Sequence, residues 1–169
     1  VSEVLAGFRL GRATDEGVTF GALSGADQVA TVQKLVDDAL AQGATVASGG
    51  VLPTGLPAGG SYFPATVLTN VPTTADIAHS EIFGPVVAIQ TFATEDEGIA
   101  MANDTPFGLA AYVFAGDTGR ALTIAERIEA GMVAINKGTI SDPAAPFGGV
   151  KESGVGREGG MEGIGEYLE

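Results

Sequence analysis

The amino-acid sequence predicts an α/β fold with a largely parallel, twisted sheet and helices on both faces. Short apolar or β-branched runs around Thr45, Thr66, Val87, Tyr112 and Val133 alternate mostly with segments of helical spacing. Such alternation is typical of parallel strands that are joined by helices. The length of 169 residues is that of one domain. We therefore expect residues 1–169 to form a single domain or one large piece of one.

The elements of the first half follow from local signals. Val1–Arg12 is expected to be the end of an element that begins elsewhere. A capping signal precedes a helix whose apolar residues recur at helical spacing from Val29 to Leu40, with Gly43 as its candidate C-cap. A short strand, an exposed loop, a strand broken by Pro64 and a turn or short helix follow, at Thr45–Ala47, Gly49–Ser61, Tyr62–Val71 and Thr73–His79.

The second half continues the alternation. Thr94 and Glu97 form a capping box for a helix that runs to Asn103, and Asp117 caps a helix that ends at Gly131. The β-branched and apolar runs predict strands at Pro85–Phe92, Gly108–Ala115 and Met132–Ile135. A Gly-, Ser- and Pro-rich stretch then extends to Gly160, and one helical turn is expected near Met161–Tyr167. Unstructured loops of that length are uncommon unless they are functional or disordered, and we favour function.

Composition excludes several classes of protein. The net charge of −13, from 21 acidic and 8 basic residues, argues against binding nucleic acid through phosphate neutralisation. No apolar run approaches the roughly 18 residues of a transmembrane helix, and no signal segment is recognised, so we expect a cytoplasmic protein without a membrane partner. The chain has no cysteine and one histidine, His79. We therefore assign no metal site, no disulfide and no catalytic residue within it.

Two loops are the candidate functional edge. Ligands of such sheets bind beyond the carboxyl ends of the strands, which nominates Ala78–Pro85 and Asn136–Gly149. Gly154–Gly159 also spells GxGxxG, but no buried strand precedes it and the chain has no room for the acidic residue about 20 positions on that a dinucleotide fingerprint needs.

Four collinear blocks resemble the aldehyde dehydrogenase superfamily. Ser80–Val86 resembles its EIFGPV motif, and Asn136 with Pro146–Gly154 resembles its PFGGxKxSG motif; Asn103–Leu109 and Ala125–Gly131 resemble the segments between them. The similarity covers nearly the whole chain and implies the C-terminal part of the catalytic domain of that family. The closing GVGREGG and GIGEYLE segments look most like succinate-semialdehyde dehydrogenases.

The resemblance also implies the roles of four residues. Glu81 resembles a glutamate that accepts hydrogen bonds from the nicotinamide ribose, the alternative being a solvated loop acid. Phe83 resembles a phenylalanine beside the nicotinamide, the alternative being a core aromatic. Ser141 stands where a serine helps to hold the distal carboxylate of the substrate, although it could equally form a Ser-Asp-Pro turn. Phe147 resembles an aromatic residue of the aldehyde tunnel or serves as a core plug.

Other motif positions receive structural expectations. Asn136 and Lys151 are expected to order the loops, His79 to be structural or exposed, and Arg157 with Glu158 to form a surface ion pair.

The implied enzyme uses NAD or NADP and a small-molecule aldehyde. In the family, the nucleophilic cysteine and the dinucleotide-binding half lie upstream of a segment like this one. We therefore expect a truncated fragment that is inactive by itself, holds no cofactor tightly and forms homo-oligomers. The alternative is a non-catalytic, stand-alone self-association domain derived from that family.

Overall fold

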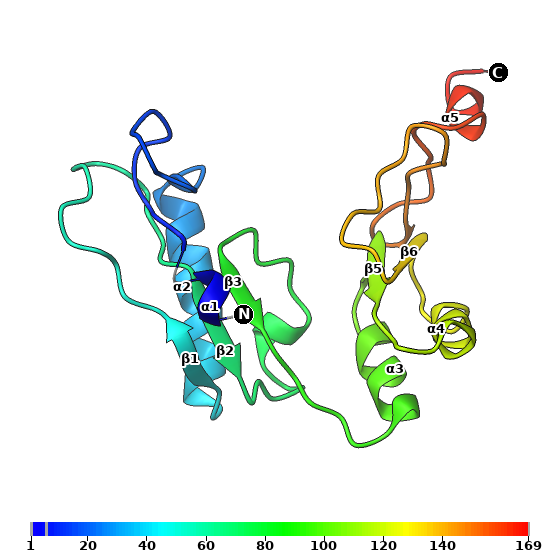
Figure 1. The fold of residues 1–169 in the computed structure, drawn as a ribbon, viewed down its shortest axis with the longest axis horizontal. Coiled ribbons are helices and arrows are strands. Elements are labelled where there is room, and N and C mark those ends of the chain that lie inside the picture. The colour runs from blue at the N-terminus through cyan, green and yellow to red at the C-terminus, as the bar shows by residue number, and fades with distance from the viewer. Residues whose placement is uncertain (1, 6, 169) are drawn as a thin grey trace. The chain divides into compact units, whose positions relative to one another are not determined.

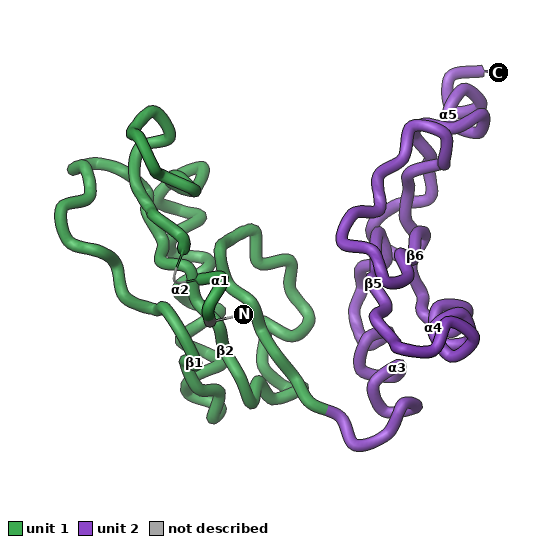
Figure 2. The backbone as a smooth tube through the Cα atoms, in the orientation of Figure 1, with its two compact units in different colours: residues 1–91 green, residues 92–169 purple. Residues whose placement is uncertain are grey.

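The computed structural model describes residues 2–5 and 7–168. The chain separates into two compact units, residues 1–91 and residues 92–169, which Figure 2 shows in different colours. Helices and strands occur in both units, which confirms the α/β class. The predicted element at Val1–Arg12 is described only in part, as α1 (Ser2–Leu5), because Val1 and Ala6 lie outside the described residues.

The first unit is a small sheet with one long helix packed on it. The sheet has the order β1 (Thr45–Gly49), β2 (Thr66–Thr69), β3 (Val86–Ala88), and η1 (Asp76–Ala78) lies between the last two strands in sequence. Helix α2 (Ala26–Ala41) is drawn behind the strands in Figure 1. Its apolar face joins the strands in one core cluster, which contains Val32, Leu35, Val36, Ala39, Leu68 and Val86.

The start of α2 corrects one prediction. Its N-cap is Gly25, and no side chain accepts a capping hydrogen bond there, so the signal at Ser24–Asp27 does not act as a capping box. The predicted end is shifted by one residue, because the C-cap is Gln42 and Gly43 follows it. Gly43 adopts φ 109°, and its N–H donates to the carbonyl of Leu40. This left-handed conformation favours glycine after a helix.

The largely parallel sheet is the main correction to the predicted fold. Strand β2 pairs in parallel with β3 but antiparallel with β1. The described strands form three separate small sheets, with two parallel and two antiparallel pairings among them. No helix occurs between Gly49 and Thr66. A parallel return requires a crossover, whereas an antiparallel neighbour needs only a loop.

The second unit contains a parallel strand pair joined by a helix. Strands β5 (Ala110–Val113) and β6 (Met132–Ile135) pair in parallel register from Ala110–Met132 to Val113–Ile135. Helix α4 (Thr118–Ala125) connects them and packs against both strands. The connection is thus the βαβ crossover that the sequence pattern predicted for this segment.

Both predicted caps of this unit are confirmed. At the start of α3 (Glu95–Asn103), the Thr94 hydroxyl accepts a hydrogen bond from the Glu97 N–H at 3.2 Å. The Glu97 carboxylate reaches back to the N–H of Ala93 at 2.7 Å. The Asp117 carboxylate accepts from the Arg120 N–H at 2.7 Å, although α4 ends at Ala125 rather than continuing to Gly131.

The strand predicted at Gly108–Ala115 is divided. Its first residue, Gly108, ends β4 (Phe107–Gly108), which pairs antiparallel with β7 (Val150–Lys151), while β5 begins at Ala110. The strand predicted at Pro85–Phe92 is likewise limited to Val86–Ala88. The helical turn near the end of the chain is confirmed as α5 (Glu162–Gly165). Across residues 2–5 and 7–168, none of the helices has both the length and the apolar character for crossing a membrane.

Candidate functional site

In the first unit, the candidate site is the loop between η1 and β3. Glu81 is exposed, and its carboxylate makes no hydrogen bond or ion pair with any residue that the structure describes. Phe83 is 71% exposed and adopts φ 46°, a left-handed conformation that is uncommon for a bulky residue. The loop therefore presents a carboxylate and an aromatic ring, two positions apart, to the outside of the unit.

Close packing against α2 holds this loop. A Cβ on Gly84 would lie 2.7 Å from Cγ2 of Val32, which is fully buried in the core. Only glycine permits the backbone to approach the helix so closely. The side chain of Gln28, one helical turn earlier on α2, also donates to the loop backbone. No motif singled out Gln28, because its partners are far away in the sequence.

In the second unit, Ser141 and Phe147 line one small pocket. Its volume is ≈ 280 Å³, and the lining residues are Ser141, Asp142, Pro143, Ala145, Phe147, Glu158 and Gly159. Phe147 is half-buried and exchanges two backbone hydrogen bonds with Glu158, at 2.6 and 2.7 Å. This antiparallel bridge closes the long loop on itself and holds the backbone of Phe147, a residue of the pocket wall.

The turn at Ser141 is built by its neighbour. The carboxylate of Asp142 accepts a hydrogen bond from the N–H of Ala144 at 2.9 Å, and its carbonyl accepts from the N–H of Ala145 at 3.1 Å. The hydroxyl of Ser141 makes no hydrogen bond within the described part of the chain. The turn thus needs Asp142 and leaves the Ser141 hydroxyl available to a ligand.

Asn136 and Lys151 order the loops, as expected from their motif positions. Asn136 has φ 51°, and its side-chain amide pairs with both the N–H and the carbonyl of Ala115, each at 2.9 Å. Lys151 has φ 54° and forms an ion pair with Glu129 at 2.7 Å. Its Nζ also donates to the carbonyl of Asn103 at 2.8 Å. Both ends of the loop from 136 to 151 are therefore anchored.

The predicted ion pair between Arg157 and Glu158 is wrong. Nη1 of Arg157 instead donates to three backbone carbonyls, those of Gly149, Val155 and Gly156, at 2.8, 2.8 and 3.0 Å. A Cβ on Gly148 would lie 2.6 Å from Cδ of this arginine. A guanidinium can serve several carbonyl acceptors at once, so Arg157 stabilises the turn that follows Phe147.

One carboxyl group, outside both loops, has a shifted pKa. The pKa of Asp38 is lowered by hydrogen bonds from the Gln42 side chain and from the Asp76 N–H, but this residue lies on α2, outside both loops. Among the residues described, His, Asp and Glu side chains form no cluster of three that could hold a metal ion.

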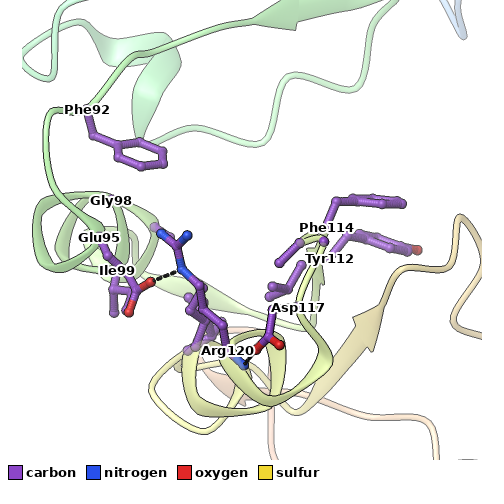
Figure 3. A pocket seen from close by; sticks show the side chains of 14 residues that line it. Phe92, Glu95, Gly98, Ile99, Tyr112, Phe114, Asp117 and Arg120 are labelled. Carbon is purple, nitrogen blue, oxygen red and sulfur yellow. Dashed lines mark hydrogen bonds and ion pairs between the residues drawn. The ribbon is translucent and has the colours of Figure 1, made fainter.

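A larger pocket of ≈ 520 Å³ lies elsewhere in the second unit, among α3, β5 and α4. Figure 3 shows Phe92, Tyr112 and Phe114 near it, with the Arg120 side chain paired to Glu95 at 2.6 Å. The charged groups of this pocket are engaged in that ion pair and in the cap of α4, and none of the four predicted site residues lines it. We assign it no chemistry.

The structure thus brings the predicted residues together in pairs. Glu81 and Phe83 share one loop of the first unit, and Ser141 and Phe147 share one pocket of the second. The expectation that all four lie at a common edge stays a prediction.

Comparisons with known proteins agree on one family. The aldehyde dehydrogenase family model matches residues 1–169. A glutarate-semialdehyde dehydrogenase of Pseudomonas putida is 46% identical over 100% of this chain, which spans 34% of that protein. The NADP(+) succinate-semialdehyde dehydrogenase GabD of Escherichia coli is 43% identical over 100% of this chain and 34% of its own length.

Solved structures give the same result. The crystal structure of a Mycobacterium tuberculosis aldehyde dehydrogenase complexed with NAD+ superimposes with a TM-score of 0.90 at 36% identity, covering 98% of this chain and 34% of that one. The chain therefore spans about a third of the length of the relatives that it matches.

Proposed function

The chain belongs to the aldehyde dehydrogenase family, and from that premise we propose that it is part of an NAD(P)-dependent enzyme that oxidises an aldehyde to the carboxylic acid. The observation that carries the proposal is the match of the whole chain to this family, at 46% and 43% identity to dehydrogenases of two semialdehydes. In that longer protein, residues 1–169 would be the C-terminal part of the catalytic domain.

We infer that the aldehyde has an anionic group at its far end, and we favour succinate semialdehyde. Glutarate and succinate semialdehydes, for which the two relatives are named, both carry a carboxylate opposite the aldehyde. The Ser141 hydroxyl, which has no partner among the residues described, can donate one hydrogen bond to such a carboxylate. The half-buried Phe147 supplies an apolar wall beside it.

The exposed loop of the first unit fits a pyridine nucleotide. Both oxygens of the Glu81 carboxylate remain available, and a carboxylate can accept hydrogen bonds from the two hydroxyls of a ribose. The exposed ring of Phe83 offers a flat apolar surface for a nicotinamide. When bound, NAD or NADP supplies the acceptor for the hydride that leaves the aldehyde carbon. We assign the choice between NAD and NADP to no residue of this chain.

We expect residues 1–169 to be inactive by themselves. Family chemistry requires a cysteine thiolate as nucleophile, and this chain has no cysteine. We accordingly assign it no catalytic residue and expect no tight cofactor binding without the rest of the protein. The expected location is cytoplasmic, and the expected assembly is a homo-oligomer.

The decisive experiment compares aldehydes in the longer protein. Succinate semialdehyde, glutarate semialdehyde and uncharged butanal are assayed with NAD and with NADP. Ser141→Ala should raise KM for both semialdehydes by about tenfold, because a hydrogen bond to a charged group is lost, and should leave KM for butanal unchanged.

Thr139→Ala is the matched control. It removes an exposed hydroxyl of the same loop, and this hydroxyl makes no hydrogen bond among the residues described. An equal effect of Ser141→Ala on charged and uncharged aldehydes would contradict the assignment of Ser141. Absence of aldehyde oxidation with every substrate and both nucleotides would contradict the proposed enzyme.

The second candidate is a non-catalytic self-association domain. Several large apolar side chains favour it because they are open to solvent, among them Val51, Met161 and Tyr167, which are 81%, 83% and 86% exposed. Sedimentation of the chain over a range of concentrations tests self-association. A monomer at all concentrations would remove this candidate.

A further inference from the structure

One side-chain amide connects α2 to two successive peptide units of the Glu81 loop. Gln28 lies in the first turn of α2, and its Nε2 donates to the carbonyl oxygen of Ile82 at 3.0 Å and to that of Phe83 at 3.2 Å. The two acceptors are 54 and 55 positions away in the sequence. They are the carbonyls that directly follow Glu81, so the direction of this segment depends on where Gln28 holds them.

The backbone that Gln28 holds is strained. Phe83 adopts φ 46°, and a non-glycine residue remains in that conformation only where its surroundings impose it. Packing of the Phe83 side chain does not impose it, because that side chain is 71% exposed. The restraint must therefore act on the backbone, and the hydrogen bond to the Phe83 carbonyl acts there.

A second contact lies on the same face of the helix. Positions 28 and 32 are one turn apart, and Val32 meets the loop at Gly84, where there is no room for a Cβ. Ile82 also packs against the core cluster. Helix α2 therefore holds the loop by a polar contact at Gln28 and an apolar contact at Val32, on either side of Phe83.

We propose that Gln28 is a positioning residue for nucleotide binding. Its amide sets the backbone at Ile82 and Phe83. It thereby directs the Glu81 carboxylate toward the nicotinamide ribose and the Phe83 ring toward the nicotinamide. The inference rests on the function proposed above for Glu81 and Phe83. In this role Gln28 acts through the loop backbone.

The test compares Gln28→Ala with Gln33→Ala in the longer enzyme. Gln33 is an exposed glutamine of the same helix whose amide bonds only to Asp37, within α2, at 2.8 Å. Gln28→Ala should weaken NAD(P) binding about tenfold, because two hydrogen bonds to the loop are lost. Gln33→Ala should leave the Kd unchanged.

Further readouts separate positioning from a general loss of structure. KM for the nucleotide should rise with Gln28→Ala while KM for the aldehyde stays the same. Partial unfolding would instead lower the number of active molecules and leave both KM values unchanged. Deuterium uptake at residues 82–86 should increase in Gln28→Ala and not in Gln33→Ala. Gln28→Lys, which keeps a donor of similar reach, should recover most of the affinity, whereas Gln28→Glu, which has no donor, should not.

Glu81→Gln distinguishes this inference from the proposed function. If Glu81→Gln weakens nucleotide binding and Gln28→Ala does not, Gln28 has no positioning role and the proposed function stands. If neither substitution weakens binding, the ribose role of Glu81 is wrong and the inference is overturned with it. Equal losses in Gln28→Ala and Gln33→Ala would also overturn the inference.

Discussion

Replacing Asn136 should destabilise the second unit in a way that depends on the replacement. The Asn136 side chain pairs with the N–H and the carbonyl of Ala115 at 2.9 Å each, and its backbone has φ 51°. Asn136→Gly removes the two hydrogen bonds but tolerates the backbone conformation. Asn136→Ala removes the same bonds and adds the cost of a left-handed alanine.

The magnitudes follow from these contacts. Two hydrogen bonds at about 0.5–1.5 kcal/mol each give a loss of about 1–3 kcal/mol for Asn136→Gly. The left-handed conformation adds about 1–2 kcal/mol for alanine, and the extra freedom of glycine in the unfolded chain offsets about 0.4–1 kcal/mol of that difference. Asn136→Ala should therefore be the less stable variant by about 0.8 kcal/mol at the midpoints of these ranges, and by at most about 1.6 kcal/mol.

Urea unfolding of the chain, followed by circular dichroism and by tyrosine fluorescence, measures both variants. Tyr112 on β5, in the strand pair next to the substitution, contributes to this fluorescence together with Tyr62 and Tyr167. Lys137→Ala, an exposed neighbour of Asn136, is the control and should change the free energy of unfolding by less than about 0.5 kcal/mol. If Asn136→Gly and Asn136→Ala are both as stable as Lys137→Ala, the paired amide does not anchor this loop.

Three other changes test the core, the acid stability and the long loop. Leu68→Ala should lower the free energy of unfolding by about 2–5 kcal/mol, because Leu68 is fully buried; a loss below 1 kcal/mol in urea titrations would contradict the packing. Hydrogen bonds from Gln42 and from the Asp76 N–H keep the pKa of Asp38 below 3.8 in the folded state. The ionised Asp38 side chain therefore adds to the free energy of unfolding above about pH 4, and this contribution is lost as the pH falls through the folded pKa. Asp38→Asn should remove this part of the pH dependence of unfolding. An unchanged midpoint of acid unfolding would contradict the role of Asp38. Arg157→Lys should cost about 1–3 kcal/mol and increase deuterium uptake around its three carbonyl acceptors; unaltered uptake would show that they do not need the guanidinium.

Residues of the candidate site could be predicted from the sequence where they stand in a recognisable motif. Residues that act through contacts with distant parts of the sequence could not. Glu81, Phe83, Ser141 and Phe147 were nominated from short motifs, and the structure places them in an exposed loop and a small pocket. Their functional roles stay predictions. The roles of Gln28 and Arg157 were missed, because nothing in a helical glutamine or a loop arginine indicates that its partners are backbone carbonyls.

The sequence by itself determined the elements whose signals are local. The caps at Thr94 and Asp117 and the glycine after α2 were correct, because each depends on atoms within a few residues of one another. Only the tertiary structure decided the pairing of the strands and the division into two units. Whether β2 meets β1 antiparallel depends on contacts between segments separated by a loop, and the apolar pattern of a strand is the same for a parallel and an antiparallel neighbour.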